Sequence, residues 1–304
     1  MGRVFARILR QHKIPVSYSA CIEDPCNQMK LYYVRSKAEY DALKSEGWHG
    51  HYQALQRLLP ADEQDFFIPG FSLAANQMVD FKVRFIPGKY PQINWRERVL
   101  CPVTRLNNRM RFAAAMIDVL GRGLSSDPMY IMEQTTRLYH HLKTQYPNLI
   151  GSEFVDASLE SGSVTAEGIQ HQDATALSFD DSSFQAVYSF DVLEHIPRYT
   201  VALQEVFRAL RPQGRFLFTA PFINADQTLI RATLAADGSI EHHREPEYHG
   251  DPMSSDGVLC YQHFGWDVLT ALKEVGFSDA YAVVGWSLGL GFITPQIMFV
   301  AEKA

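Results

Sequence analysis

Residues 184–199 read FQAVYSFDVLEHIPRY, and this stretch decides the fold. Residues 184–190 carry too little polarity to be half exposed, which predicts a strand buried on both faces of a sheet. Three polar side chains follow the strand at once: Asp191, Glu194 and His195. In open α/β sheets, ligands bind beyond the carboxyl ends of the strands. The cluster therefore indicates a ligand site at the end of this strand.

Strand and helix patterns alternate through the second part of the chain. The predicted strands are Met129–Met132, Asn148–Val155, Gly168–His171, Phe184–Phe190, Arg215–Pro221, Ala280–Trp286 and Gln296–Ala301. The predicted helices between them are Thr135–Tyr146, Pro197–Leu210 and Trp266–Val275. Strands separated by such helices imply right-handed crossovers and helices on both faces of the sheet. The pattern predicts an α/β fold with a Rossmann-like, seven-stranded, mostly parallel sheet.

Charge divides the chain of 304 residues into two parts. Residues 1–120 contain 17 Lys and Arg and 11 Asp and Glu, which gives a net charge of +6. Residues 121–304 contain 11 Lys and Arg and 23 Asp and Glu, a net charge of −12, so the whole chain has a net charge of −6. Gly121-Arg122-Gly123 forms a plausible junction. We predict a smaller basic N-terminal accessory domain over 1–120 and the α/β domain over 121–304.

The sequence contains no apolar run near the roughly 20 residues that span a bilayer. The N-terminal segment MGRVFARILRQHK is basic, and we expect a short surface helix there. Four cysteines without framework spacing indicate a reducing compartment. The predicted location is the cytoplasm.

Acidic side chains follow several predicted strands, and the set is Glu133, Glu153, Asp173 and Asp191. A single acid in this position is unremarkable, because Asp and Asn cap helices. Four in succession indicate a polar ligand across the sheet edge, although four independent caps remain the alternative.

Four motifs, in this order, resemble the class I S-adenosylmethionine-dependent methyltransferases, and within them the D-V-L-E-H group of methyltransferase type 11. They are Asp173–Phe179, Phe184–Val187, Asp191–Ile196 and Leu210–Arg215. The resemblance covers residues 129–222, and residues 265–302 would complete the sheet. It implies an enzyme with S-adenosylmethionine as its cofactor.

The resemblance implies roles for residues at the strand ends. Glu153 would accept hydrogen bonds from the ribose hydroxyls, because a carboxylate accepts from two adjacent hydroxyls at once. Asp173 and the backbone of Ala174 would meet the adenine. Phe190 and Asp191 would border the methionine end and the methyl group.

The first loop of the family is usually rich in glycine, but here the matching residues 132–137 read MEQTTR. Glu133 keeps the acidic position. Side-chain contacts from Gln134 and Thr135 would replace the backbone contacts with the cofactor, and Thr135 or Thr136 would cap the next helix. A binding or scaffold protein on the same fold stays an alternative.

The sulfonium of the cofactor is already activated, so the protein mainly positions nucleophile and methyl group. A hydroxyl acceptor also needs a base. His195 is the candidate for that role, and Asp191 is the second catalytic candidate, beside the methyl group. The alternative is that His195 only bonds the backbone or a helix start.

The spacing Asp191-x-x-Glu194-His195 is also similar to the E-x-x-E-H arrangement that holds a divalent ion in small-RNA 2′-O-methyltransferases and some quinone-pathway O-methyltransferases. A fourth ligand could come from one of the histidines further along the chain, which are His242, His243, His249 and His263. Because D-V-L-E-H is common in relatives without a metal, we predict no metal here.

An insertion at residues 223–264 falls where such enzymes usually build the acceptor pocket. We predict a lid whose acceptor contacts are Arg244, Tyr248 and His249, with a solvated loop as the alternative. The predicted reaction is O-methylation of a small molecule or a saccharide.

The N-terminal part contains a basic and aromatic stretch. From Phe81 to Arg111 eight Lys and Arg are opposed only by Glu97. Basic residues among aromatic ones can bind nucleic acid, although an isolated basic face is more often simply solvated. A nucleic-acid methyltransferase is therefore the second enzymatic hypothesis.

The region around residues 70–112 resembles a degenerate zinc ribbon, with knuckles at residues 71–76 and 101–104. Only Cys101 remains of the thiols, and one thiol cannot close a structural zinc site. We predict no zinc there, with packing or hydrogen bonds in its place.

Overall fold

The computed structural model describes residues 29–45, 59–60, 62–120, 126–250 and 256–304. Several sequence expectations lie outside these residues. They are the N-terminal helix, the junction at residues 121–123, and Cys21 and Cys26.

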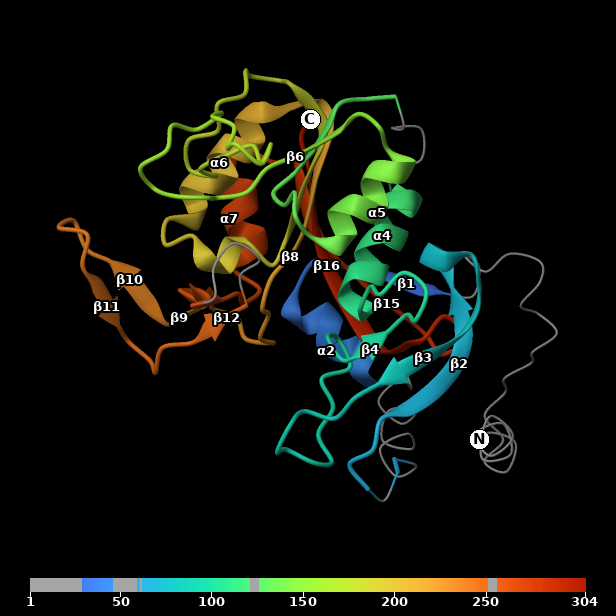
Figure 1. Cartoon of the computed structure of the whole chain (residues 1–304). Helices are drawn as coiled ribbons and strands as arrows, with labels where there is room; N and C mark the ends of the chain where they lie inside the picture. The colour runs from blue at the N-terminus through green and yellow to red at the C-terminus, as the bar shows by residue number, and fades with distance from the viewer. Residues whose placement is uncertain (1–28, 46–58, 61, 121–125, 251–255) are drawn as a thin grey trace. The chain divides into compact units, whose positions relative to one another are not determined.

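A seven-stranded sheet has the order β1-β15-β16-β8-β7-β5-β6 (Figure 1). Its strands are β1 (Lys30–Val34), β5 (Met129–Ile131), β6 (Leu149–Gly151), β7 (Phe184–Phe190), β8 (Leu210–Thr219), β15 (Asp279–Ser287) and β16 (Phe292–Glu302). The pairs β5–β6, β5–β7 and β7–β8 are parallel, whereas β16 pairs with β8 antiparallel. The α/β fold with a seven-stranded sheet is confirmed.

One predicted strand, Gly168–His171, is wrong. Thr165 and Gly168 form a turn in which Gly168 has a φ of 81°, so the stretch folds back and Val164 pairs antiparallel with Gln170. Only His171 continues toward the sheet, through an isolated parallel bridge with Glu153. The seventh strand is instead β1, which the sequence patterns did not predict.

Three helices follow the predicted strands, each shorter than its sequence pattern. They are α5 (Arg137–Gln145), α6 (Tyr199–Ala209) and α7 (Val268–Val275). Thr136 caps α5, because its hydroxyl accepts a hydrogen bond from the backbone N–H of Tyr139 at 3.1 Å. Strand β8 already begins at Leu210, where the helix pattern was predicted to end.

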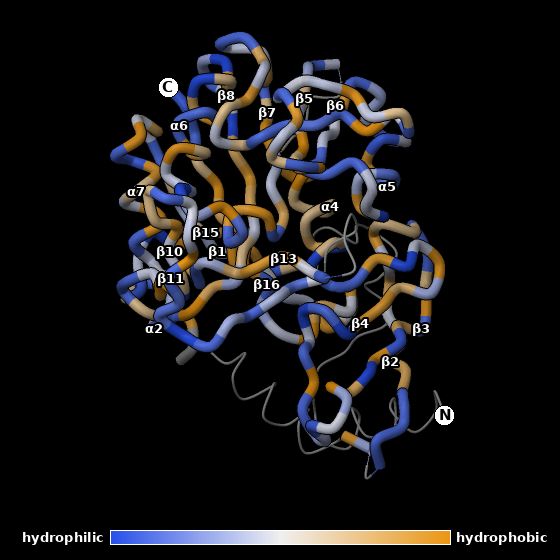
Figure 2. Tube along the Cα trace, turned by 60° about the vertical axis from the view of Figure 1, so that its left-hand side comes forward, coloured by the Kyte–Doolittle hydropathy of each residue, from blue (hydrophilic) through white to orange (hydrophobic). Residues whose placement is uncertain are grey.

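Burial explains why β7 lies inside the sheet. All of its side chains except Gln185 are buried. Figure 2 shows mostly hydrophobic colouring along the inner strands and hydrophilic colouring in the outer loops. Because β5, β6, β7 and β8 run parallel, their carboxyl ends lie at one edge of the sheet, where the loops carry the polar residues.

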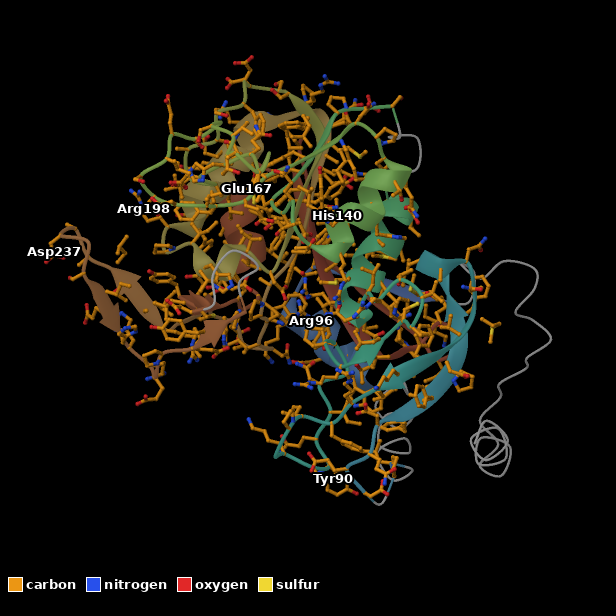
Figure 3. The ribbon with its side chains drawn as sticks, in the orientation of Figure 1. Tyr90, Arg96, His140, Glu167, Arg198 and Asp237 are labelled. Atoms are coloured by element: carbon orange, nitrogen blue, oxygen red, sulfur yellow. The ribbon has the colours of Figure 1, made fainter. Side chains whose placement is uncertain are left out.

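The insertion consists of short antiparallel pairs. Its strands are β9 (Leu229–Ile230), β10 (Ala232–Leu234), β11 (Ile240–His242), β12 (Tyr248–His249), β13 (Val258–Leu259) and β14 (Gln262–His263). Strands β10 and β11 form a projecting hairpin, with Asp237 at its tip (Figures 1 and 3). Strands β12 and β13 pair with each other, and β14 pairs with β9.

The chain divides into two compact units. One contains residues 1–33, 41–120 and 283–297, and the other contains residues 34–40, 121–282 and 298–304. Helix α2 (Lys37–Ser45) runs from the second unit into the first. The domain boundaries 1–120 and 121–304 stay a prediction.

The first unit holds a three-stranded antiparallel sheet of β2 (Phe66–Ser72), β3 (Gln77–Val83) and β4 (Val99–Leu100), followed by helix α4 (Asn108–Leu120). The buried Ser72 hydroxyl donates to Sγ of Cys101 at 3.4 Å. Among the described residues, Cys101 lies in no cluster of three potential metal ligands. The resemblance to a zinc ribbon stays a prediction.

No helix within the described ranges is long and apolar enough to cross a membrane.

Candidate functional site

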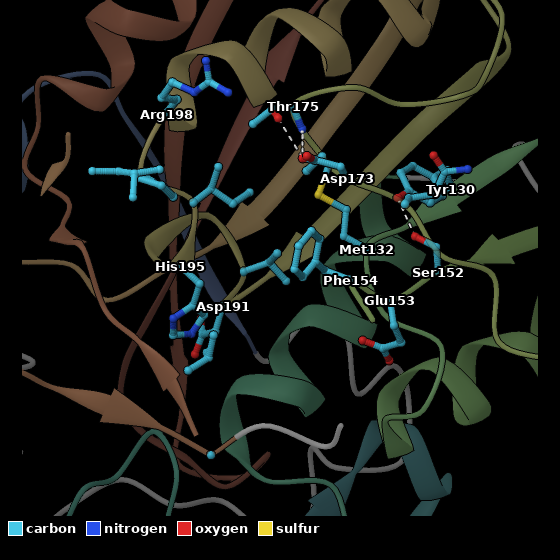
Figure 4. A pocket seen from close by; sticks show the side chains of 18 residues that line it. Tyr130, Met132, Ser152, Glu153, Phe154, Asp173, Thr175, Asp191, His195 and Arg198 are labelled. Atoms are coloured by element: carbon cyan, nitrogen blue, oxygen red, sulfur yellow. Dashed lines mark hydrogen bonds between the residues drawn. The ribbon is translucent and has the colours of Figure 1, made fainter. Parts of the chain in front are cut away.

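A cavity of about 420 Å³ opens at the carboxyl ends of the parallel strands (Figure 4). Its walls come from β5, from the residues after β6, from residues 172–175, from residues 191–198 after β7, and from three positions of the insertion. The lining residues are Tyr130, Met132, Ser152, Glu153, Phe154, Gln172, Asp173, Ala174, Thr175, Asp191, Val192, His195, Ile196, Pro197, Arg198, Leu234, Gly250 and Val258. This volume lies within the range of small-molecule sites.

Glu153 ties the glycine-free first loop to the neighbouring strand. Its Oε1 accepts hydrogen bonds from the backbone N–H groups of Gln134 and Thr135, both at 2.8 Å, and from the Thr135 hydroxyl at 2.7 Å. Within the described residues no hydrogen bond engages its Oε2. Glu153 therefore keeps one acceptor oxygen for a ligand in the cavity.

The side-chain amide of Gln134 forms hydrogen bonds with two backbone groups of the segment 168–170. Its amide nitrogen donates to the carbonyl of Gly168 at 3.0 Å, and its amide oxygen accepts from the backbone N–H of Gln170 at 2.8 Å. The close approach of this loop depends on Gly151, because a Cβ there would lie 2.6 Å from the carbonyl oxygen of Glu133. A glycine at the end of β6 thus provides space for a loop that has no glycine of its own.

Two further hydrogen-bonded pairs shape the cavity wall. Oδ1 of Asp173 accepts from the backbone N–H and the hydroxyl of Thr175, at 2.8 and 2.7 Å. The Tyr130 hydroxyl and Ser152 Oγ lie 2.7 Å apart. Both pairs are drawn with dashed lines in Figure 4.

Asp191 has a φ of 58°, in the left-handed region that non-glycine residues seldom adopt. Its backbone N–H donates to the carbonyl of Thr219, and its Oδ1 accepts from the Thr219 hydroxyl at 2.8 Å. Strand β8 thus holds Asp191 in a conformation that turns the chain sharply at the end of β7. Strained residues of this kind are concentrated at functional sites.

His195 lies in the cavity wall with one ring nitrogen fixed. Its Nδ1 is 2.8 Å from the carbonyl oxygen of Leu259, and because a carbonyl only accepts, Nδ1 carries the hydrogen. In the neutral ring Nε2 then bears the lone pair. Nε2 lies 3.7 Å from Oε1 of Glu194, a carboxylate with no exposed surface. Burial raises the pKa of Glu194 to about 7, against a smaller opposing effect of His249.

His249, from β12, lies between two carboxylates. Its Nδ1 is 3.6 Å from Oε1 of Glu194, and its Nε2 is 3.0 Å from Oε1 of Glu247. The contact with Glu194, followed by the contact with Glu247, raises the pKa of His249 to about 9, although burial acts in the opposite direction. Glu247 also contacts His263 at 3.3 Å and Arg231 at 3.1 Å.

Backbone and amide hydrogen bonds fasten the insertion to the segment after β7. The backbone N–H of Tyr261 donates to the carbonyl of Glu194 at 2.8 Å. The Gln262 amide donates to the carbonyls of Leu193 and Ile196 at 2.7 and 3.1 Å. These contacts give His195 and the insertion a fixed mutual position.

The structure brings only part of the predicted site together. Five of the predicted residues line the cavity: Glu153, Asp173, Ala174, Asp191 and His195. Seven do not: Glu133, Gln134, Thr135, Phe190, Arg244, Tyr248 and His249. The buried ring of Phe190 stacks on Tyr188, Tyr248 is 59% exposed, and the Arg244 guanidinium donates to the carbonyl of His243. Their roles stay predictions.

Sequence reasoning missed several lining residues that stand directly beside the predicted ones. Met132 and Ser152 directly follow β5 and β6, and Phe154 and Thr175 follow predicted site residues. Their place in the sequence, directly after a strand or directly after a predicted site residue, could have identified these four as lining residues. Leu234, Gly250 and Val258 had no such signal, because they depend on how the insertion folds.

Two groups of potential metal ligands occur among the described residues. One is Glu194, His195 and His249, and the other is Glu247, His249 and Cys260. Burial raises the pKa of the Cys260 thiol to about 12. Asp191, the first residue of the sequence pattern that resembles a metal site, belongs to neither group.

Residues 135–218 match the model of a family described as a methyltransferase domain. Among solved structures, the chain is similar to an S-adenosylmethionine-dependent methyltransferase from Mesorhizobium loti, with 15% identity over 58% of this chain and 91% of that chain, at a TM-score of 0.37. A second similar structure is the 1,6-didemethyltoxoflavin-N1-methyltransferase from Burkholderia thailandensis, solved with that compound and S-adenosylhomocysteine. It has 16% sequence identity over 64% of this chain and 78% of its own chain, at a TM-score of 0.37. A third is human N-acetylserotonin methyltransferase in complex with SAM, with 16% identity over 65% of this chain and 56% of its own chain, at a TM-score of 0.33.

Proposed function

Because this chain belongs to the class I S-adenosylmethionine-dependent methyltransferases, we propose that it methylates a hydroxyl group of a small molecule or a saccharide. One observation carries the proposal. A single cavity is lined by the carboxylates Glu153, Asp173 and Asp191, by the imidazole of His195, and by residues of the insertion. Its carboxylates are acceptors for the hydroxyl and amino groups of a nucleoside, and its imidazole is a potential proton acceptor.

The residues present fit the cofactor. Oε2 of Glu153 is available to accept from the ribose hydroxyls, while Oε1 already holds the first loop. Asp173 and Ala174 would hold the adenine, and Asp191 would border the methionine end. When bound, S-adenosylmethionine supplies an activated methyl group on a sulfonium. The protein has to exclude water and orient the acceptor.

His195 is the residue that we propose activates the acceptor hydroxyl. The carbonyl of Leu259 fixes its Nδ1–H, which leaves the lone pair of Nε2 directed at other groups. Its side chain is 14% exposed, so the ring is accessible from the cavity but mostly shielded from bulk water. A positioned imidazole of this kind contributes about 10²–10⁴-fold to proton transfer.

Three residues of the insertion support a small acceptor. Leu234, Gly250 and Val258 face the cavity and add apolar surface without a charged side chain. Small-molecule sites have this mixture of apolar walls and few polar groups. Arg244 and Tyr248 remain proposed acceptor contacts from the rim.

The alternative of a nucleic-acid acceptor rests on the basic stretch from Phe81 to Arg111. Lys82 and Arg84 are paired with Asp65, and Arg96 and Arg109 with Glu97. Arg111 is completely buried beneath Phe81 and Phe292, with its guanidinium bonded to the carbonyl of Leu290. Most of this stretch is thus engaged within the protein, which favours the small acceptor.

The test begins with calorimetry of S-adenosylmethionine and S-adenosylhomocysteine binding to the full chain and to Glu153→Ala. Transfer of a labelled methyl group is then measured with hydroxyl-bearing small molecules, saccharides, RNA and DNA in parallel, and mass spectrometry locates the methyl group. We expect cofactor binding that depends on Glu153 and an O-methylated small product. Methylation of RNA or DNA alone, or on a nitrogen or carbon atom, would overturn the proposed acceptor.

A further inference from the structure

The projecting hairpin of β10 and β11 has one apolar face and one polar face (Figure 1). Leu234 lies directly opposite Ile240, so their side chains share a face, and Ala232 belongs to the same face two residues earlier. The other face carries Thr233 opposite Glu241. An antiparallel pair with this alternation normally covers its apolar face and leaves its polar face in water.

The base of the hairpin is anchored next to His195. Ala232 is buried in a cluster with Leu259 and Tyr261, and its backbone N–H donates to the carbonyl of Tyr261 at 3.2 Å. Leu259 is also the residue whose carbonyl accepts the Nδ1 hydrogen of His195 at 2.8 Å. One residue therefore contacts both the hairpin and the proposed base, which fixes the apolar face of the hairpin relative to that base.

Beyond this base, the apolar face is exposed to solvent. Leu234 is 44% exposed and Ile240 is 43% exposed, and we call these two side chains the hairpin strip. Leu234 lines the cavity, and Ile240 extends the same face past the lining residues. The turn that follows is closed by its own bond, from the backbone N–H of Ala235 to the carbonyl of Ser239 at 2.8 Å. The hairpin strip is therefore an apolar surface continuous with the cavity, and such surfaces mark binding sites.

The cofactor does not account for the hairpin strip, because the proposed cofactor contacts come from the strand ends and not from the insertion. A second copy of the chain does not account for it either. Stable interfaces bury at least about 600 Å² on each partner, and two half-exposed side chains supply far less. The remaining occupant is the methyl acceptor, since Leu234 borders the cavity in which we place its hydroxyl.

We propose that the acceptor carries an apolar group, alkyl or aryl, which packs on Leu234 and Ile240 while its hydroxyl lies against His195. This inference rests on the proposed function and narrows its acceptor, because a free saccharide has no group that would remove the hairpin strip from water. Each methylene group that leaves water tightens binding by up to about fourfold. Binding of the apolar group does not require methyl transfer, so the two can be measured separately.

The experiment uses the full chain saturated with S-adenosylhomocysteine. Calorimetry measures the binding of phenol, 4-ethylphenol, 4-butylphenol and 4-hexylphenol, with glucose as a ligand that has no apolar group. Leu234→Ser and Ile240→Ser shorten the hairpin strip, and because both side chains are half exposed, both variants should fold. The matched control is Thr233→Ser, which removes one methyl group from the opposite face of the same strand. Circular dichroism checks the fold, and sedimentation checks the oligomeric state.

We expect the dissociation constant to fall about two- to fourfold for each added carbon, and so at least about 50-fold from phenol to 4-hexylphenol. Leu234→Ser and Ile240→Ser should each lose at least about fivefold of this gain, whereas Thr233→Ser keeps it. If one of the two variants does not fold, the other decides. With labelled S-adenosylmethionine, transfer to the phenol hydroxyl gives a methyl ether, S-adenosylhomocysteine and a proton, and kcat/KM should rise along the same series.

Equal affinity for phenol and 4-hexylphenol, or the same length dependence in both serine variants as in the wild-type protein, overturns the apolar site. A change of oligomeric state in Leu234→Ser would assign the hairpin strip to an interface between copies and would also overturn it. Length-dependent binding without methyl transfer overturns only the proposed O-methylation. Methyl transfer without length dependence overturns only the apolar group of the acceptor.

Discussion

Oε1 of Glu153 accepts hydrogen bonds from both the backbone N–H and the hydroxyl of Thr135, at 2.8 and 2.7 Å. The carboxylate that we propose binds the ribose therefore already holds the first loop, which has no glycine of its own. The proposed ribose contact would use Oε2, because Oε2 has no such bond within the described residues.

Glu153→Ala should raise the dissociation constant of S-adenosylmethionine by at least about tenfold, since hydrogen bonds to charged groups contribute about 1.5–3 kcal/mol. Calorimetry checks this value. Thr135→Val removes one bond to Oε1 and the predicted side-chain contact of Thr135 with the cofactor, but leaves both backbone donors, so its loss of affinity should be smaller than that of Glu153→Ala. An equal loss in both variants would contradict a direct contact of Glu153 with the ribose.

Asp191 should tolerate asparagine far better than alanine. Asparagine readily adopts the left-handed φ of 58° and keeps an acceptor for the Thr219 hydroxyl, so Asp191→Asn should change the free energy of unfolding by less than about 1 kcal/mol. Asp191→Ala loses that bond and adds backbone strain, and it should cost about 1–3 kcal/mol. Urea denaturation measures both. Equal stability of the two variants would contradict the strain.

The strand that carries Asp191 was predictable because burial on both faces leaves a continuous apolar run, and the acid directly after it marked the sheet edge. Glu153, which follows β6, was predictable for the same reason, whereas Asp173 lines the cavity although the strand that was predicted before it does not form. Gly168–His171 misled the prediction, because four residues of suitable composition cannot reveal that Thr165 and Gly168 turn the chain back. A local pattern can indicate an extended segment, but it does not show which other segment will pair with it.

The contacts of Glu194 with His249 could not have been located from the sequence. Four histidines of the insertion were equally eligible, and only the folded pairs β12–β13 and β14–β9 select His249 for the buried carboxylate. His263 reaches Glu247 instead, and His243 lies against Thr233. The choice among them depends on long-range backbone contacts, such as that from Tyr261 to Glu194.

The ion pair of Arg35 and Asp279 should make a small contribution to stability that disappears in acid. The guanidinium bonds the carboxylate at 2.6 and 3.4 Å and lowers the pKa of Asp279, while burial opposes this shift. A carboxyl group with a lower pKa in the folded state stabilises the protein above its unfolded pKa of about 3.9 and loses that contribution as the pH falls through the folded value. Both side chains are partly exposed, so we expect less than about 1 kcal/mol.

Urea unfolding of the wild-type protein and Asp279→Asn, from pH 7 to pH 2.5, measures this contribution. The difference between their midpoints should be largest near neutrality and should vanish at the acid end. Arg35→Met is the matched control, and in that background the effect of Asp279→Asn should lose most of its pH dependence. A difference that stays constant with pH would show that Asp279 stabilises the fold without its charge.

His195→Ala should lower kcat by about 10²–10⁴-fold, because Nε2 of His195 is the proposed proton acceptor for the substrate hydroxyl. The carbonyl of Leu259 fixes Nδ1–H, so Nε2 carries the lone pair of the neutral ring. The affinity for S-adenosylmethionine should stay unchanged, because His195 is not among the residues that we propose hold the cofactor. Steady-state kinetics and calorimetry measure the two quantities, and the control His243→Ala, whose ring lies against Thr233, should behave as the wild-type protein. A wild-type kcat in His195→Ala would contradict the role as base.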